Sequence, residues 1–133
     1  MTGILIFCNR AQIIWHSKRQ NGVETSTFGS ELKALKNAVE LITTLRYKLR
    51  MFGVLIGGPT DMFCNIEAVY NDYTPESKLR KKHHSISYHM TRKAVASGAC
   101  RIAKEDILTN LADLFTKVLP KHRQEYNLNK FTY

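Results

Sequence analysis

The stretch SELKALKNAVELITTLRYKLRMFG, residues 30–53, carries the clearest structural pattern in the chain. Its apolar residues recur at intervals of three and four, and they are Leu32, Leu35, Ala38, Val39, Ile42, Leu45, Leu49 and Phe52. An α-helix turns once about every 3.6 residues, so this spacing puts them in one stripe. Gly53 then supplies the left-handed residue that ends many helices. The stretch therefore predicts a long helix over about residues 30–52 with one buried face.

Apolar, β-rich runs on either side of this helix predict strands. Residues 3–7 and 12–16 are separated by the short turn CNRA, which favours an antiparallel hairpin. Residues 62–64 and 100–103 read as two further buried strands.

Helices are expected between and after these later strands. One helix is expected over residues 83–97, closed by Gly98, and a last one near residues 107–115, ended by Pro120. Residues 67–70 favour a short helix start, and the tail from Lys121 shows no clear period. The order predicts an α/β fold in one domain, residues 1–133, with a mixed sheet flanked by helices.

Charge limits the classes of partner. The chain has 133 residues, of which 20 are Lys or Arg and 11 are Asp or Glu, giving a formal net charge of +9. Such a balance favours nucleic acid, an anionic surface or an acidic protein, without choosing among them.

The cysteines bear on the compartment. Cys8, Cys64 and Cys100 lie far apart in apolar segments and lack the paired spacing of a zinc site. They are expected to be buried thiols in a reducing environment. The GILIF run is too short for a membrane span, so we expect an intracellular protein that does not bind membranes.

Five sequence words, found in the order of a known family, carry a resemblance. They are WHSKRQNGVETSTFGSELKAL (15–35), LRYKLRMFG (45–53), FCNIEAVY (63–70), PESKLRKKHHSISYH (75–89) and NLADLFTKVLP (110–120). Together they resemble the ribonuclease H domain at the C-terminal end of copia-type retrotransposon polyproteins, over nearly the whole chain. The resemblance implies a ribonuclease-H-like sheet flanked by helices.

In that family four carboxylates hold two Mg²⁺ ions, and the RNA strand of an RNA–DNA hybrid is cut. The resemblance matches Glu31 and Asp113 to two of these acids and places Asn65 where the third is Asp. An amide resembles a carboxylate in shape but has no charge, so Mg²⁺ is not expected to bind tightly. Glu31 and Asp113 are either surviving metal ligands or ordinary acids at helix N-termini, where the helix dipole favours them.

The remaining family acid lies on the first strand of the family fold, which precedes the hairpin. This chain matches the family only from the second strand of that fold onward. The first strand is central in the family sheet, so its absence is expected to expose two sheet edges. Three outcomes stay open: the sheet closes up, another chain supplies a strand, or the domain sits inside a larger assembly.

Basic residues are the candidate nucleic-acid contacts, and they are Lys18, Arg19, Arg80, Lys81 and Lys82. The alternative is a solubilising basic surface. The histidines of KKHHSISYH, which are His83, His84 and His89, are expected to pack or to contact phosphate rather than to bind metal. Trp15 and Tyr88 are expected in the core.

Three functions follow from these observations. The first is a catalytically inactive ribonuclease H remnant that still binds an RNA–DNA hybrid. The second is an adopted structural subunit whose exposed sheet edge docks onto another protein or a ribonucleoprotein. The third, least favoured, is an active nuclease in which a partner restores the missing strand, or in which Asp61 or Glu67 joins Glu31 and Asp113.

Overall fold

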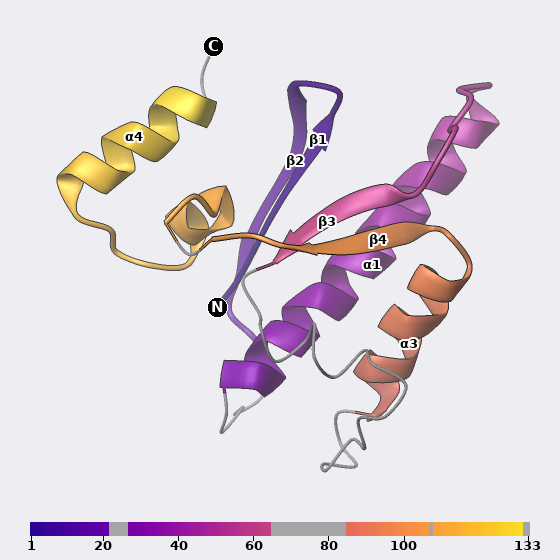
Figure 1. Ribbon diagram of the computed structural model, residues 1–133, viewed down its shortest axis with the longest axis horizontal. Coiled ribbons are helices and arrows are strands. Elements are labelled where there is room, and N and C mark those ends of the chain that lie inside the picture. The colour runs from indigo at the N-terminus through magenta and orange to yellow at the C-terminus, as the bar shows by residue number, and fades with distance from the viewer. Residues whose placement is uncertain (22–26, 65–84, 107, 132–133) are drawn as a thin grey trace.

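The computed structural model describes residues 1–21, 27–64, 85–106 and 108–131. Its elements, shown in Figure 1, are β1 (Thr2–Cys8), β2 (Ala11–Lys18), α1 (Thr27–Met51), β3 (Thr60–Cys64), α3 (Ser85–Ala96), β4 (Cys100–Lys104), the 3₁₀ helix η2 (Leu111–Phe115) and α4 (Lys121–Phe131). The α/β class predicted from the sequence is confirmed. No helix in the described ranges is long and apolar enough to cross a membrane.

The predicted hairpin is confirmed as the antiparallel pair β1–β2. Asn9 makes its turn with a φ of 55°, a left-handed conformation that asparagine tolerates better than most residues. In β1 the side chains alternate between faces, and Ile4 and Ile6 are buried. The hairpin therefore contributes one apolar face to the core.

The long helix is also confirmed, as α1, and its end has the chemistry that the sequence predicts. Gly53 has a φ of 79°. Its N–H donates to the Arg50 carbonyl at 2.9 Å, and the next N–H, of Val54, reaches the Leu49 carbonyl at 3.0 Å. This is the Schellman pattern, which satisfies carbonyls that a helix end leaves unpaired.

Strands β3 and β4 pair in parallel, joined through α3. Gly98, with a φ of 70°, ends α3 as predicted, with bonds from Gly98 N to Val95 O and from Ala99 N to Ala94 O, both 3.0 Å. The predicted helix start at residues 67–70 lies outside the described residues.

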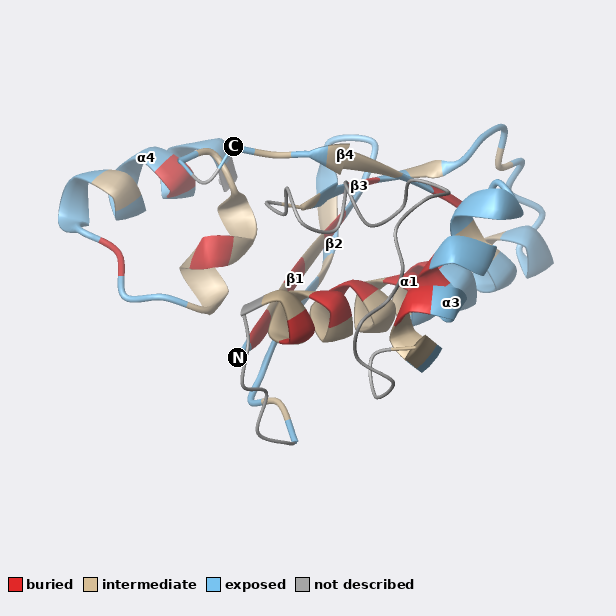
Figure 2. Ribbon diagram, turned by 60° about the horizontal axis from the view of Figure 1, so that its bottom comes forward, coloured by how far each residue is buried: buried red, intermediate tan, exposed pale blue. Residues whose placement is uncertain are grey.

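The single mixed sheet expected from the sequence is not what the described residues form. They form two separate two-stranded sheets, β1–β2 and β3–β4. In Figure 1 α1 passes behind β3 and β4. Side chains of both strand pairs and of α1 share one hydrophobic core. The core residues are Ile4, Ile6, Leu35, Val39, Ile42, Met62 and Cys100. In Figure 2 buried residues mark α1 and β1, whereas most of α3 is exposed.

The C-terminal part departs from the prediction. Of the helix expected near residues 107–115, only the 3₁₀ turn η2 forms in the described residues, and the aperiodic tail forms α4. Pro120 precedes α4 rather than ending a helix: its carbonyl accepts bonds from Arg123 N and Gln124 N at 3.0 Å. Proline suits this position because it lacks the N–H that a first helical turn leaves unpaired.

The predicted burial of Trp15 and of Cys8 is wrong, whereas that of Cys100 and of Tyr88 is confirmed. Trp15 is 64% exposed, because it lies on the face of β2 opposite to the half-buried Ile14. Cys8 is exposed at the hairpin turn, whereas Cys64 is half-buried and Cys100 is buried. Tyr88 is buried in α3, as expected.

Candidate functional site

Glu31 lies in the second turn of α1, and its side chain is half-buried. The helix already begins at Thr27, and its first turn contains no acid. The interpretation of Glu31 as an ordinary first-turn acid is therefore wrong, because the helix begins further upstream than the sequence indicated. The macrodipole acts mainly within the first turn, so it contributes little at Glu31.

Asp113 lies in η2 and is only 7% exposed. Asn110 caps this turn, and its side chain accepts a hydrogen bond from Ala112 N at 3.0 Å. The turn is fixed against the hairpin, where Ser17 Oγ donates to the Phe115 carbonyl at 2.7 Å. Asp113 is thus an acid of the first turn of a helix, and it is also buried by contacts far away in the sequence.

Glycine at position 3 permits this close approach of η2 to β1. A Cβ atom on Gly3 would lie 2.6 Å from Thr116 Cγ2 and 2.7 Å from the Ala112 carbonyl oxygen. Both distances are too short for non-bonded atoms, so a larger residue would displace η2. The position of Asp113 therefore depends on Gly3.

The two predicted acids interact electrostatically. Burial raises the pKa of Glu31, Lys117 lowers it, and the charge of Asp113 raises it further. Lys117 Nζ lies 3.0 Å from Asp113 Oδ2, and Arg123 Nη2 lies 3.5 Å from the same oxygen. We call Glu31, Asp113, Lys117 and Arg123 the carboxylate cluster; it contains two acids and two bases.

The cluster is a poor match for a divalent metal. In the parts of the chain that the structure describes, no three His, Cys, Asp or Glu side chains come together as a ligand set. Mg²⁺ prefers an octahedral shell of oxygens. Here the ammonium group of Lys117 already lies 3.0 Å from Asp113 Oδ2 and lowers the pKa of Glu31, so it takes the place beside these carboxylates that a metal ion would need.

Asp61, the acid considered as a substitute ligand, is engaged elsewhere. Its Oδ1 lies 2.7 Å from both Nε and Nη2 of Arg101 on the neighbouring strand β4. His89 packs edge-on against Tyr88, with ring centroids 5.4 Å apart. Other predicted positions lie outside the described residues, and they are Asn65, Glu67, Arg80, Lys81, Lys82, His83 and His84.

Lys18 and Arg19 are exposed at the end of β2. They line a pocket of about 140 Å³ together with Lys33 of α1. Gln20 fixes this segment on α1, because its Nε2 donates to Thr2 Oγ1 at 2.9 Å and to the Ser30 carbonyl at 2.8 Å. Lys18 and Arg19, both predicted to contact nucleic acid, thus lie beside a third basic residue, Lys33.

Sequence reasoning missed Lys33, Lys117 and Arg123. A signal existed for Lys117, which follows Asp113 by four residues in ADLFTK, the spacing of a helical ion pair. No such signal existed for Arg123, because α4 was not predicted.

Two plant retrotransposon polyproteins are similar in sequence to most of this chain. It is 30% identical over 120 residues to the retrovirus-related Pol polyprotein from transposon RE2 of Arabidopsis thaliana, covering 90% of this chain and 8% of that protein. The polyprotein from transposon RE1 of the same plant is 31% identical over 120 residues, with the same coverage. The chain is homologous to one short segment of retrotransposon Pol polyproteins. The copia-type retrotransposon part of the resemblance is thereby confirmed.

A third relative comes from another plant. The Pol polyprotein from transposon TNT 1-94 of Nicotiana tabacum is 30% identical over 127 residues, which is 93% of this chain and 9% of that protein. No family model matches the chain, and no solved structure matches it. The assignment of this retrotransposon-derived segment to ribonuclease H stays a prediction.

Proposed function

We propose that this retrotransposon-derived chain is a ribonuclease H remnant that has lost hydrolytic activity and retains affinity for RNA–DNA hybrids. One observation supports the loss of activity above all. The Glu31–Asp113 pair is already balanced by Lys117 and Arg123, so the cluster makes little demand for a divalent cation.

Two-metal hydrolysis needs several carboxylates, because each ion is held by oxygen ligands while it stabilises the attacking or the leaving oxygen. The described residues provide two acids at this place. Asn65, at the position matched to a third acid, carries no charge. The chain's own residues would keep the cluster neutral and η2 against β1, and we assign them no step in bond cleavage.

The positive charge supports hybrid binding. A formal charge of +9 and the exposed pair Lys18 and Arg19 favour contacts to phosphate oxygens, which need no base recognition. Such binding weakens as salt rises, because released counterions provide much of its free energy.

The decisive experiment combines cleavage and binding on one preparation. A labelled RNA–DNA hybrid is incubated with Mg²⁺ or Mn²⁺ beside a Glu31→Gln control, and affinity is measured at two salt concentrations. We expect no cleavage, salt-sensitive binding, and a loss of affinity of about tenfold in a Lys18→Glu, Arg19→Glu double variant. An Arg92→Glu, Lys93→Glu variant on α3 gives the same charge change elsewhere as a control.

Metal-dependent cleavage that the Glu31→Gln variant lacks would overturn the proposed loss of activity. Equal losses of affinity in the two double variants would contradict a role for Lys18 and Arg19. The absence of both cleavage and binding would favour the second candidate function.

That second candidate is a structural subunit that docks through a sheet edge. Both sheets have only two strands in the described ranges, yet they share one core with α1. Unpaired strand edges are places where another chain adds a strand. Size-exclusion chromatography with light scattering, alone and with candidate partners, tests this function.

A further inference from the structure

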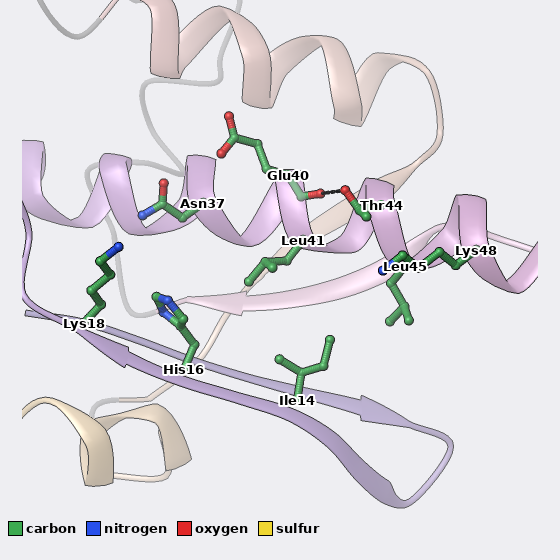
Figure 3. Close-up of a pocket in the computed structure, with 9 residues that line it drawn as sticks. All are labelled: Ile14, His16, Lys18, Asn37, Glu40, Leu41, Thr44, Leu45 and Lys48. Carbon is green, nitrogen blue, oxygen red and sulfur yellow. Dashed lines mark hydrogen bonds between the residues drawn. The ribbon is translucent and has the colours of Figure 1, made fainter.

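A shallow groove of about 410 Å³ runs between β2 and α1, away from the carboxylate cluster. Figure 3 shows its two sides: Ile14, His16 and Lys18 project from β2 toward the helix, and Leu41 and Leu45 of α1 point back toward the strand. Neither strand of the β3–β4 pair lines it in the described residues. The groove thus lies at one edge of the molecule's core.

The floor of the groove is aliphatic. Ile14, Leu41 and Leu45 are each half-buried and pack against the hydrophobic core. Aliphatic side chains that remain half-exposed gain free energy when a ligand covers them. The described residues that line the groove include no Phe, Tyr or Trp, so it offers no stacking surface for nucleobases.

The two ends of the groove are basic. Lys18 stands at one end and Lys48 at the other, both exposed (Figure 3). The acid that lines the groove, Glu40, turns its carboxylate away from β2 and pairs with Lys36 at 3.3 Å. Among the described residues that line the groove, no acid therefore faces the positive charge at either end, and this charge selects an anionic ligand.

The strand that forms one side of the groove has a free edge. β2 pairs with β1, and no second strand pairs with it among residues 1–21, 27–64, 85–106 and 108–131. An edge of this kind offers backbone N–H and C=O groups to an extended peptide, whereas nucleic acid has no complementary row of groups. Backbone pairing, an aliphatic floor and basic ends together favour a peptide.

We propose that the groove binds an extended peptide segment, with aliphatic side chains in its centre and acidic side chains at both ends, as an added strand beside β2. The helix side of the groove, from Asn37 to Lys48, is about 17 Å long at a rise of about 1.5 Å per residue. A strand of about five to seven residues covers this length at about 3.3 Å per residue.

A peptide of sequence Glu-Thr-Val-Thr-Val-Thr-Glu has this pattern on one face and serves as the probe. Its binding to the full chain is measured by fluorescence anisotropy. We expect saturable binding that falls at least about tenfold when alternate backbone nitrogens are methylated, which removes hydrogen-bond donors without changing the protein. We expect a similar loss when both Glu residues are replaced by Lys.

Matched protein variants locate the site. Thr44→Trp fills the groove, and Thr43→Trp is its control: each threonine is exposed on α1 and bonds to the carbonyl four residues earlier, but Thr43 does not line the groove. Lys48→Glu reverses the charge at one end, with the exposed Arg50→Glu as its control. Each groove variant should weaken binding about tenfold and each control less than about twofold.

Circular dichroism shows whether each variant is folded, and the methylated peptide tests the proposal even if a variant is not. The proposal is overturned by absence of saturable binding, by indifference to methylation, or by equal effects of Lys48→Glu and Arg50→Glu. If a single-stranded RNA probe binds and loses affinity in Thr44→Trp while the peptide does not bind, the groove is a nucleic-acid site instead. This inference does not rest on hybrid binding, so either can fail without the other.

Discussion

Lys117 Nζ lies 3.0 Å from Asp113 Oδ2, and the same ammonium group lowers the pKa of Glu31. One cation thus serves two acids that are far apart in the sequence. Burial raises the pKa of Glu31 more than any charge does, and the charge of Asp113 raises it further. The two charged neighbours therefore act on Glu31 in opposite directions.

The first prediction follows from the opposite effects of Lys117 and Asp113 on the pKa of Glu31. Lys117→Met should raise the pKa of Glu31, because it removes the neighbouring positive charge, and Asp113→Asn should lower it, because it removes a like charge. NMR titration of the Glu31 side-chain carboxyl carbon measures both shifts. Lys121→Met, a loss of charge at a lysine whose side chain is 90% exposed, is the control and should leave this pKa unchanged. Shifts of the same sign in the two cluster variants would contradict the assigned cluster.

The second prediction concerns stability and pH. The pKa of Glu31 is raised above its ordinary value of 4.5, so the folded protein binds this proton more tightly than the unfolded chain does. Glu31 therefore makes the free energy of unfolding fall as pH rises from about 4.5 through the folded pKa, and the loss is complete above it. Glu31→Gln removes this titration.

Urea unfolding of both proteins at a series of pH values tests the sign. The free energy of unfolding of the variant minus that of the original protein should increase with pH across this window and then level off. Glu125→Gln, the same substitution on an exposed side chain of α4, is measured beside it as the control. A difference that decreases with pH would show that Glu31 is stabilised as a carboxylate, contrary to the effect of burial.

The sequence predicts the described strands and helices of residues 1–104 well because each has its own local signal. Glycine ends α1 and α3 with the expected left-handed φ, and the apolar stripe of α1 forms the core. Only the family resemblance predicts that Glu31 and Asp113 lie close together. No local sequence pattern links two residues in separate elements. The structure brings them together through contacts of η2 with the hairpin.

Other features have no local signal. The mean hydropathy of α4 is low, so no apolar stripe marks it, and its Arg123 contacts Asp113, a residue of a different element. The burial of Trp15 was predicted wrongly because alternation along β2 defines two faces but does not say which one α1 covers. The division into two sheets likewise depends on how strands are arranged in space, which their sequences do not state.

The third prediction tests the contact between η2 and β1. Gly3→Ala would place a Cβ atom 2.6 Å from Thr116 Cγ2, so the turn must shift. Overpacking of this kind costs about 1–3 kcal/mol, and we expect that loss in the free energy of unfolding. Gly57→Ala is the control, because its Cβ would meet nothing within 4 Å. Equal stability of the two variants would show that η2 does not rest on β1.

The fourth prediction concerns the thiols. Cys8 is exposed, whereas Cys100 is 2% exposed and burial raises its pKa. Because the thiolate is the reactive form, iodoacetamide should modify Cys8 at least about tenfold faster than Cys100 in the folded protein. Peptide mass spectrometry over a time course measures the two rates, and labelling in urea should make them similar. Rapid modification of Cys100 without urea would mean that the core opens easily at β4.

The last prediction tests whether both strand pairs depend on one core. Leu35 of α1 is 5% exposed and belongs to the cluster that joins Ile4 and Ile6 of β1 with Met62 of β3. Leu35→Ala should lower the free energy of unfolding by about 2–5 kcal/mol, since it leaves a cavity in this shared core. Leu55→Ala, the same change at a residue that is 98% exposed, should have almost no effect. Hydrogen exchange then distinguishes two arrangements: if the core is shared, amides of β1 and of β3 lose protection together in Leu35→Ala, whereas loss in one strand pair alone would mean that each sheet is stabilised separately by α1.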